Sequence, residues 1–480
     1  KGAFKAGALT IERFRLGDAT SQLVGSAALA ADAQSASVRL TIGDVSRFST
    51  LFGRQLAGRL ELEGKATASL RKGDYAVSFD GAAADLALGK GVLAGLVGTS
   101  MQLAGDVAGD AAGGLALRNF KATGKNLSLA AKGRYAQNAI ELDHTMEVGD
   151  LAAVQPGLTG AAKLAVVVRG TPAKLSSKVR VSTRDATWSG KAIAGLAFDF
   201  DGTGPLTAHA GRAELKGRVG RQPLAGSAQV TLGRGGLFSA QDVSVKIGRN
   251  TMTGHLRFAA GATPSGKLVV KAGHLADLDA ILGQSISGAL TGDVEIFGDK
   301  ASPSLRVNAE APVIAFAGST LKRLKAAAVL RDFTGKMNGR ASVTLAELAS
   351  TTSTARKLSL DLRDREGRMA FAAAGRINGA LMRVDGSFQQ QGNGVDVTVD
   401  RVDLKHGRLR VKLVERAQFG FADGSLRIRR LRLAAGGGQL ALDGDASGDA
   451  LNLEARIERV PATIANAFVP DLGLGGTVSG

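Results

Sequence analysis

Residues 286–307, ISGALTGDVEIFGDKASPSLRV, alternate between apolar and polar positions along their first half. The apolar or glycine positions are Ile286, Gly288, Leu290, Gly292, Val294 and Ile296, and the positions between them are Ser287, Ala289, Thr291, Asp293 and Glu295. A period of two predicts a β-strand that is buried on one face only. Gly298, Asp299, Ser302 and Pro303 then predict a turn, after which Leu305 and Val307 resume the alternation. The stretch therefore predicts a hairpin with one apolar face and one polar face.

This hairpin belongs to a unit that recurs along the chain. Before it, Leu275, Leu278, Ile281 and Leu282 have helical spacing, so each unit predicts a short helix, then Leu/Ile-x-Gly, then a hairpin. Short helices are expected at residues 44–53, 150–158, 274–283 and 460–468. The copies divide the chain into segments 1–53, 54–157, 158–283, 284–469 and 470–480, all parts of one continuous β-groove. The last segment begins a further copy, which indicates an internal fragment of a longer repetitive protein.

Most of the remaining sequence also predicts short alternating strands. The clearest late strands are expected at residues 395–399, 409–413, 426–428 and 440–442, and residues 86–103 are interpreted as a strand interrupted by glycines. Asp-Gly pairs at positions 80–81, 201–202, 385–386, 423–424 and 443–444 predict hairpin turns. The pattern favours a mostly β protein, an antiparallel meander with few short helices.

The size of such a sheet restricts its shape. With about 12 residues for each strand and turn, the chain would form on the order of 40 strands and a sheet ~190 Å long. An apolar face of that size must be sheltered, by closing into barrels, stacking into sandwiches or curling into a U. Aromatic girdles typical of membrane barrels are not visible, and aromatic content of 4% is low for a sandwich core. Frequent glycines favour bending, so we expect a long curved antiparallel sheet that forms a U-shaped groove.

Composition excludes several classes of function. The chain has no cysteine, which excludes disulfides, cysteine zinc sites and thiol chemistry within it. No apolar run approaches the length of a transmembrane helix. The net charge of +18 comes from dispersed Lys and Arg, which solubilise the polar strand faces. Aromatics for base stacking are few, so nucleic acid is not an expected partner, and an anionic lipid surface matches the charge better.

The chain offers no recognisable catalytic or metal-binding constellation. His144, His209, His255, His274 and His406 are scattered, without the spacing of metal ligands. The Ser-x-x-Lys pairs at 69–72 and 319–322 match a β-lactamase-like motif, but they lie in strand or turn context and not at the start of a helix. We therefore expect no enzyme activity, no cofactor and no metal.

Residues 160–175 (GAAKLAVVVRGTPAKL) and 288–305 (GALTGDVEIFGDKASPSL) carry a family resemblance. The order of short helix, Leu/Ile-x-Gly and an alternating strand ending in Gly-x-Pro-x-x-Leu resembles the AsmA-like repeats of the TamB family. This resemblance implies a β-taco, a long groove lined with apolar side chains, anchored in the inner membrane outside this fragment and crossing the periplasm. It also implies phospholipid transport to the outer membrane, and a TamA-type outer-membrane barrel as a partner in the assembly of outer-membrane proteins.

The residues expected to contact lipid follow from the alternation. The groove lining is predicted to be Leu60, Leu62, Leu164, Val166, Val168, Val179, Val181, Leu290, Val294, Ile296, Leu305, Val307, Val397, Val399, Leu409, Val411 and Leu413. The densest basic run, with Arg427, Arg429, Arg430 and Arg432, is either a set of headgroup contacts or a solvated outer face that discourages edge pairing.

Three hypotheses of function remain open from the sequence. The first is a lipid conduit, in which each sheltered CH₂ contributes about 0.8 kcal/mol and no single residue grips a tail. The second is a scaffold that offers sheet edges to nascent outer-membrane strands. The third, a surface β-solenoid adhesin, is disfavoured because the repeat lacks a compact period.

Overall fold

The structure is a computed structural model of the chain. It describes residues 2–5, 7–30, 32–52, 55–69, 71–89, 91–205, 207–260, 262–299, 302–332, 338–351, 353–365, 368–391, 394–422, 424–448, 450–464 and 473–480. Strands make up 74% of the chain and helices 6%, which confirms the predicted curved antiparallel β-sheet with few short helices. Contacts divide the chain into two units, Lys1–Ala240 and Gln241–Gly480, and each is described by itself.

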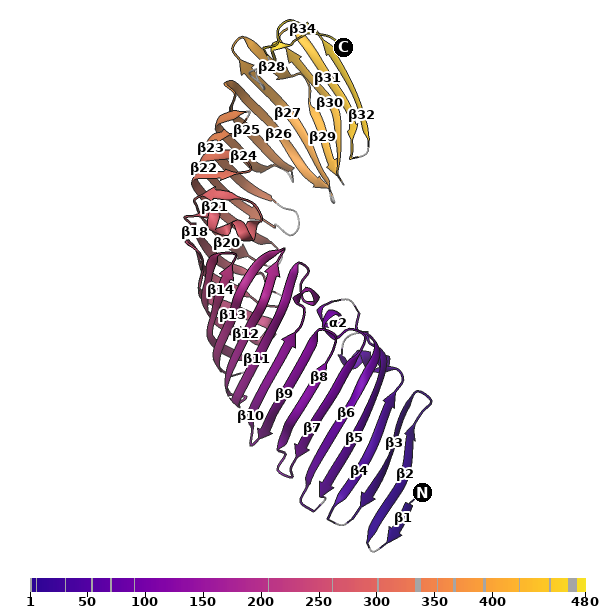
Figure 1. Cartoon of the computed structure of the whole chain (residues 1–480). Helices are drawn as coiled ribbons and strands as arrows, with labels where there is room; N and C mark the ends of the chain where they lie inside the picture. Colours follow the sequence, from indigo (N-terminus) through magenta and orange to yellow (C-terminus); the bar gives the residue numbers. More distant parts are fainter. Residues whose placement is uncertain are drawn as a thin grey trace. The chain divides into compact units, whose positions relative to one another are not determined.

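The first unit is a meander in which strands that follow one another in the chain pair side by side (Figure 1). Its strands are β1 (Gly2–Lys5), β2 (Ala8–Gly17), β3 (Ser21–Leu29), β4 (Gln34–Ile42), β5 (Ala57–Ser69), β6 (Asp74–Ala87), β7 (Met101–Gly109), β8 (Leu115–Thr123), β9 (Leu127–Ala136), β10 (Ala139–Val148), β11 (Leu158–Thr171), β12 (Lys174–Trp188), β13 (Lys191–Gly204), β14 (Ala208–Val219) and β15 (Gln222–Gly233). Its short helices are η1 (Val45–Phe48), α1 (Ser49–Phe52), α2 (Val92–Val97), η2 (Leu151–Ala153) and η3 (Arg234–Gly236). Strand β16 (Leu237–Ile247) includes the division between the units.

The second unit repeats this plan. Its strands are β17 (Asn250–Phe258), β18 (Ser265–Ala272), β19 (Ile286–Gly288), β20 (Leu290–Gly298), β21 (Pro303–Phe316), β22 (Ser319–Arg331), β23 (Asn338–Ala349), β24 (Thr354–Arg365), β25 (Arg368–Ile377), β26 (Ala380–Gln391), β27 (Gly394–His406), β28 (Leu409–Leu413), β29 (Ala417–Ala422), β30 (Ser425–Ala435), β31 (Gly438–Ala446), β32 (Leu451–Glu458), β33 (Val460–Pro461) and β34 (Thr477–Val478). Its short helices are η4 (Leu275–Leu278) and α3 (Asp279–Leu282). The predicted hairpin is β20–β21, closed where Gly298 pairs with Pro303.

The recurring Leu/Ile-x-Gly motif marks places where the strand register shifts. Register shifts occur in β5 at Gly58 and in β11 at Gly160, and the glycines there have φ of +128° and +96°. A Cβ on Gly160 would lie 2.7 Å from the Asp185 carbonyl oxygen in the neighbouring strand. Only glycine fits such a close approach at positive φ. Such bulges bend the strands and increase their twist, which accounts for the curvature of the sheet.

Three of the four predicted helices are confirmed, although they are shorter than expected. Asp44 and Asp150 cap η1 and η2, because their carboxylates accept hydrogen bonds from the backbone N–H of Ser46 (2.8 Å) and Ala152 (2.9 Å). Segment 274–283 contains η4 and α3. In segment 460–468, Val460–Pro461 form a strand, residues 463–464 are helical, and residues 465–468 lie outside the described residues. The division into five repeat segments stays a prediction.

Two sequence-based expectations about local structure were wrong. Residues 86–103 contain the helix α2 and not a continuous strand, because Gly91 and Gly98 end the strand pattern on either side of VLAGLV. The Asp-Gly pairs at positions 80–81, 201–202, 385–386 and 443–444 lie inside β6, β13, β26 and β31 and do not form turns. At 423–424 only Gly424 is described.

These Asp-Gly pairs fit the strand interior because their two residues point to opposite faces. The aspartates lie on the polar face, where Asp201 and Asp385 pair with Lys178 and Arg401. Gly386 lies on the apolar face, where a Cβ would come within 2.7 Å of the Phe371 ring, which covers it. A glycine in a strand can thus mark a close approach by a neighbour and not a turn.

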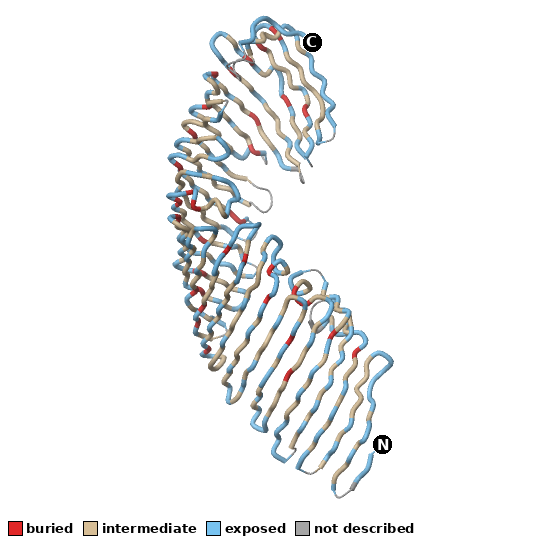
Figure 2. Tube along the Cα trace, in the orientation of Figure 1, coloured by how far each residue is buried: buried red, intermediate tan, exposed pale blue. Residues whose placement is uncertain are grey.

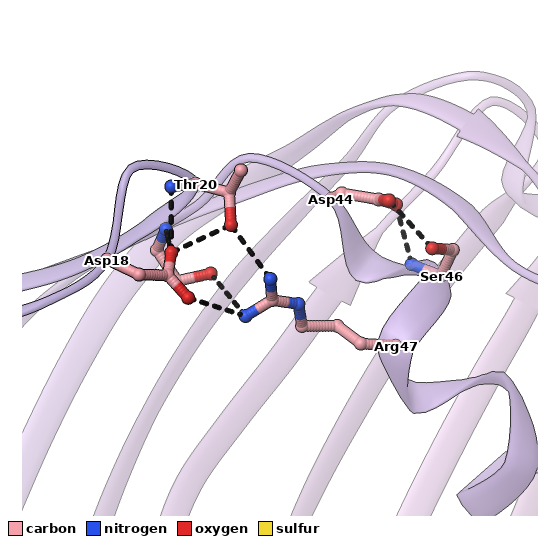
Figure 3. A network of polar contacts seen from close by, with 6 residues as sticks. Asp18, Thr20, Asp44, Ser46 and Arg47 are labelled. Atoms are coloured by element: carbon pink, nitrogen blue, oxygen red, sulfur yellow. Dashed lines mark hydrogen bonds and ion pairs between the residues drawn. The ribbon is translucent and has the colours of Figure 1, made fainter.

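A polar network holds η1 of the first unit to the turn between β2 and β3 (Figure 3). The Asp18 carboxylate accepts hydrogen bonds from the Thr20 hydroxyl (2.8 Å) and from the backbone N–H of Thr20 (2.7 Å) and Ser21 (2.8 Å). Arg47 donates to the Thr20 hydroxyl (2.8 Å) and approaches Asp18 at 3.4 Å. The Thr20 hydroxyl, followed by these backbone donors and Arg47, holds the pKa of Asp18 far below its ordinary value.

Replacing Asp18 by asparagine is therefore expected to make the β2–β3 turn less protected at neutral pH. A depressed carboxyl pKa stabilises the fold above the unfolded-state pKa of about 3.9, and this contribution is lost as the pH falls. The acid-induced loss of protection should be smaller in Asp18→Asn than in the unmodified chain. Hydrogen exchange of residues 18–21 at several pH values measures it, and an identical pH dependence in both proteins would contradict the assignment.

Candidate functional site: the apolar face of each unit

A continuous row of apolar side chains crosses the sheet of the first unit. Residues paired directly in antiparallel strands lie on the same face. From β4 to β14 the paired residues of one such row are Leu40, Leu62, Gly81, Leu103, Ala122, Leu129, Met146, Leu164, Val181, Phe198 and Leu215. The alternation noted in each strand is therefore kept in register across eleven strands, which makes one apolar face.

The second unit has an equivalent row. Its paired residues from β18 to β29 are Leu268, Val294, Val307, Ala328, Ala341, Leu362, Phe371, Gly386, Val399 and Ala417. A parallel row joins Ile296, Leu305 and Leu330. The hairpin that begins the sequence analysis thus contributes two neighbouring strands to this face.

The predicted lining residues all lie on these two apolar faces. The first unit holds Leu60, Leu62, Leu164, Val166, Val168, Val179 and Val181, and the second holds Leu290, Val294, Ile296, Leu305, Val307, Val397, Val399, Leu409, Val411 and Leu413. Val411 is buried, and the other sixteen are half-buried. That these residues contact lipid stays a prediction.

Within the part of the chain that the structure describes, no second layer of structure covers the apolar faces. Among the described residues, no large side chain is less than 2% exposed, and Figure 2 shows the buried positions as isolated points along the strands. The clearest coverage in the first unit is local, where Leu96 of α2 and Leu151 of η2 pack with Val148, Ala186 and Ile193. A sandwich would bury whole rows of these side chains. Most of each apolar face is therefore accessible to a ligand.

The opposite faces carry cross-strand ion pairs. In the first unit Lys163 bonds Glu147 (2.8 Å), Arg180 bonds Asp199 (2.7 Å), and Arg39 pairs with Glu63. Lys163 holds the pKa of Glu147 below its ordinary value. Exposed pairs of this kind contribute little to stability, because water and salt screen them. They make this face a solvated surface and leave the apolar face as the candidate binding site.

The arginine run that was predicted to contact headgroups also lies on a polar face. The carboxylate of Asp445 binds Arg429 (2.9 Å) and Arg427 (3.2 Å), and Asp443 pairs with Arg432. The Arg430 backbone N–H also donates to Asp443 (2.6 Å). Arg429 and Arg427 lower the pKa of Asp445, so the carboxylate stays ionised beside them. Three of the four guanidinium groups therefore already have counter-ions, and their role toward headgroups stays a prediction.

A few polar side chains interrupt the apolar face of the first unit. The Ser177 hydroxyl and His209 Nε2 are 2.6 Å apart, and His209 Nδ1 lies 3.3 Å from the Gly204 carbonyl oxygen. His144 is paired with Ala131 and Val166 on the same face. Its Nε2 is buried and has no hydrogen-bond partner among the described residues. His209 is thus satisfied, whereas His144 is not.

Replacing His144 by leucine is expected to stabilise the first unit by about 1 kcal/mol, because a buried nitrogen without a partner costs about 1–3 kcal/mol. The urea midpoint measures the change. His209→Leu is the matched control and should destabilise, since it breaks the hydrogen bond to Ser177. A lower midpoint for His144→Leu would show that Nε2 has a partner such as a bound water molecule.

The other sequence motifs are placed as expected, in strands or turns. Ser69 ends β5, and Ser319 begins β22, so neither Ser-x-x-Lys pair opens a helix. Among the described residues, no group of three or more His, Cys, Asp or Glu could hold a metal ion. Within that same part of the chain, none of the helices is long and apolar enough to cross a bilayer.

Comparison with known protein families identifies the relatives of this fold. Residues 197–422, just under half of the chain, match the family model described as TamB, N-terminal domain. The chain is a TamB-like protein. No individual curated protein matches it. The matched region runs from β13 in the first unit to β29 in the second and includes the hairpin of residues 286–307.

The match to the TamB family model bears on function at a coarse level. The family acts in the translocation and assembly module, and its members are anchored in a membrane and extend through the periplasm. TamB-family proteins are not known enzymes. These statements agree with the resemblance found in the sequence, whereas the cargo of the apolar face belongs to the proposal below.

One basic feature of this TamB-like chain escaped the sequence analysis. Arg340 of β23 and Arg363 of β24 are directly opposite each other on the polar face of the second unit. Neither residue belongs to a dense basic run, and only the strand register brings them together. A sequence signal for this pair would have to fix the strand register, which alternation within one strand does not do.

Proposed function

We propose that the apolar faces of this TamB-like protein shelter the acyl chains of phospholipids on their way between the inner and outer membranes. The observation that carries the proposal is the continuous row of apolar residues in each unit, most of them half-buried, which no second layer covers among the described residues. An exposed apolar patch that extends across many strands marks a binding surface. The protein would act in the periplasm, with no enzyme activity and no cofactor.

The dimensions of the sheet suit this cargo. Strands such as β11 and β12 have 14 and 15 residues, longer than a typical strand. At ~3.3 Å per residue such strands span ~45 Å, whereas the acyl layer of one leaflet is ~15 Å, half of the hydrocarbon core. The width of the face therefore accommodates whole tails and leaves headgroups at the strand ends in water.

No specific residue is needed to hold a tail in this mechanism. Each CH₂ removed from water contributes about 0.8 kcal/mol, so a tail of many methylenes binds through area and can slide from one strand to the next. A row of Leu, Val and Ala without charges provides the same environment at each step. Sliding along such a face is the transport step that we infer.

Lipid extraction and native mass spectrometry of the protein purified from bacterial membranes or periplasm test this function. We expect several phospholipids per chain, and fewer in a Val294→Asp variant, whose carboxylate would lie between Leu268 and Val307 on the apolar face. A stable, lipid-free protein would overturn the proposal.

A second candidate function is a scaffold for outer-membrane protein assembly with a TamA-type barrel partner. It is favoured by the role of the TamB family in the translocation and assembly module. An incoming strand could add to an exposed sheet edge. This function would tolerate Val294→Asp and would be lost when a proline blocks such an edge.

A further inference from the structure

Arg340 and Arg363 form a like-charge pair at the centre of the polar face of the second unit. They are directly opposite in the β23–β24 register, and both side chains are exposed. Like charges in directly opposite positions destabilise a sheet. On the same row, Arg306 of β21 is two strands away, beyond Val329 of β22. Three arginines therefore occur on one row of this face.

Two other like-charge pairs on these polar faces have a compensating partner. Asp199 and Glu214 are paired in register, but Arg180 binds Asp199 and Lys216 binds Glu214. Lys405 and Arg410 are also paired, and Asp403 neutralises Arg410.

Arg340 and Arg363 lack such a partner. Among the described residues, neither makes an ion pair or a hydrogen bond through its side chain. Arg306 does have one, since it pairs with Glu295 and lies 4.9 Å from the Phe297 ring. The positive charge of the two opposed arginines is therefore uncompensated.

The pair lies beside a hollow in the polar face. The hollow has a volume of about 380 Å³ and includes Arg306, Asn308, Arg340, Ser342, Asp361 and Arg363 in its lining. Asp361 is the one carboxylate among the described residues that line it, and no ion pair joins it to either free arginine. The Ser342 hydroxyl adds a neutral hydrogen-bonding group. The lining thus combines two uncompensated guanidinium groups with polar side chains.

We propose that Arg340 and Arg363 form a binding site for a phosphate group. A guanidinium presents parallel N–H donors that match two oxygens of a phosphate, and two such groups side by side can hold three or more of its oxygens. Binding would remove the repulsion between the arginines. The site lies on the face opposite the apolar row. The proposal therefore does not depend on whether that row binds lipid.

Further arginines extend the positive charge from this site to the ends of the strands. Arg331 ends β22, Arg365 ends β24, and Arg368 begins β25 opposite Arg365. None of these three has an ion pair among the described residues. The phosphate could therefore belong to a lipid headgroup that reaches the site from the strand ends, or to a free phosphate compound, and both share the same chemistry.

Titration calorimetry with inorganic phosphate at low ionic strength tests the site. The variant is the R340Q/R363Q double substitution, and the matched control is R410Q/R416Q, which removes the same charge from arginines that Asp403 and Asp400 already neutralise. Since hydrogen bonds to charged groups are the strong ones, we expect binding to weaken about tenfold or more in the variant and less than about twofold in the control. Equal weakening in both would mean that net charge alone attracts phosphate, and would overturn the proposal.

A second measurement distinguishes the two sources of phosphate. Vesicles of phosphatidylcholine with added phosphatidylglycerol are sedimented with the same proteins. Weaker sedimentation of R340Q/R363Q than of the control supports a lipid headgroup at the site. Equal sedimentation, together with the loss of phosphate binding, supports a free phosphate compound. Thermal unfolding checks that the variants fold, and unchanged phosphate binding in a folded variant overturns the site itself.

Discussion

Val166→Asp is expected to reduce the phospholipid bound to the first unit about tenfold or more, whereas Val167→Asp should leave it unchanged. The two valines are neighbours in β11 and point to opposite faces. Val166 is paired with His144 and Val179 on the apolar face, and Val167 is paired with Asp143 and Lys178 on the polar face. The pair of variants thus compares the same chemical change on the two faces of one strand.

The size of the effect follows from the cost of desolvating a carboxylate. An acyl chain that crosses the carboxylate introduced at position 166 would either strip water from the charge, which costs several kcal/mol, or avoid the strand. A loss of about 1.4 kcal/mol already lowers occupancy tenfold. At position 167 the carboxylate stays in water near Lys178, so it should cost little.

Lipid extraction quantified by mass spectrometry measures both variants against the unmodified protein. Circular dichroism confirms that the sheet is retained. If Val166→Asp carried the normal amount of lipid, the apolar face would not be the binding surface. If both variants lost lipid equally, the effect would come from net charge or from damage to β11, and the lipid proposal would lose its support.

The fold class was predictable because its signal is local. Alternation with period two specifies which residues of a strand share a face, so the row through Leu164 and Val181 could be anticipated residue by residue. The N-termini of η1 and η2 were equally predictable from Asp44 and Asp150, since an aspartate at the N-cap accepts a hydrogen bond from a free backbone N–H. These features depend on neighbours in the sequence alone.

The features that were missed depend on neighbours in space. Gly81 and Gly386 follow aspartates, as hairpin-turn glycines do, but they lie beneath groups of adjacent strands. The dense run at Arg427 and Arg429 suggested free charge, yet Asp445 of the next strand pairs with both. Register across strands decides both cases, and a single sequence specifies that register only weakly where glycines and bulges shift it.

The candidate site was predictable to the same extent. The sequence indicated which residues form the apolar face, and the strand pairing places them on one face of each unit. What contacts that face cannot follow from alternation, because any apolar ligand or second layer would satisfy the same pattern. The structure adds that most of the face is uncovered, so that a ligand can reach it. The lipid experiments then test whether this ligand is phospholipid.

Gly81→Ala is expected to destabilise the first unit by about 1–3 kcal/mol, as overpacking does, whereas Gly64→Ala should change its stability by less than about 0.5 kcal/mol. Both glycines lie on the apolar face of adjacent strands β5 and β6, and neither has positive φ. A Cβ on Gly81 would collide with the Glu61 carbonyl oxygen and lie 2.8 Å from Leu62 Cα. A Cβ on Gly64 would meet Ser78 O at 3.4 Å and Val38 Cγ2 at 3.5 Å, which are ordinary contacts.

Urea unfolding midpoints of the two variants measure this difference, and the comparison also separates a strand from a turn at positions 80–81. In a hairpin turn Gly81 would face solvent, and alanine there would strain only its own backbone. Inside β6 the Cβ pushes against the backbone of β5, which cannot move without breaking the pairing of Leu62 with Gly81 and of Leu62 with Leu40. If Gly81 lies inside a strand, Gly81→Ala should therefore also speed hydrogen exchange in the neighbouring strands β4 and β5. Equal midpoints for the two variants, with exchange unchanged in β5, would instead place Asp80 and Gly81 in a turn and would undo the register on which the apolar row of this unit depends.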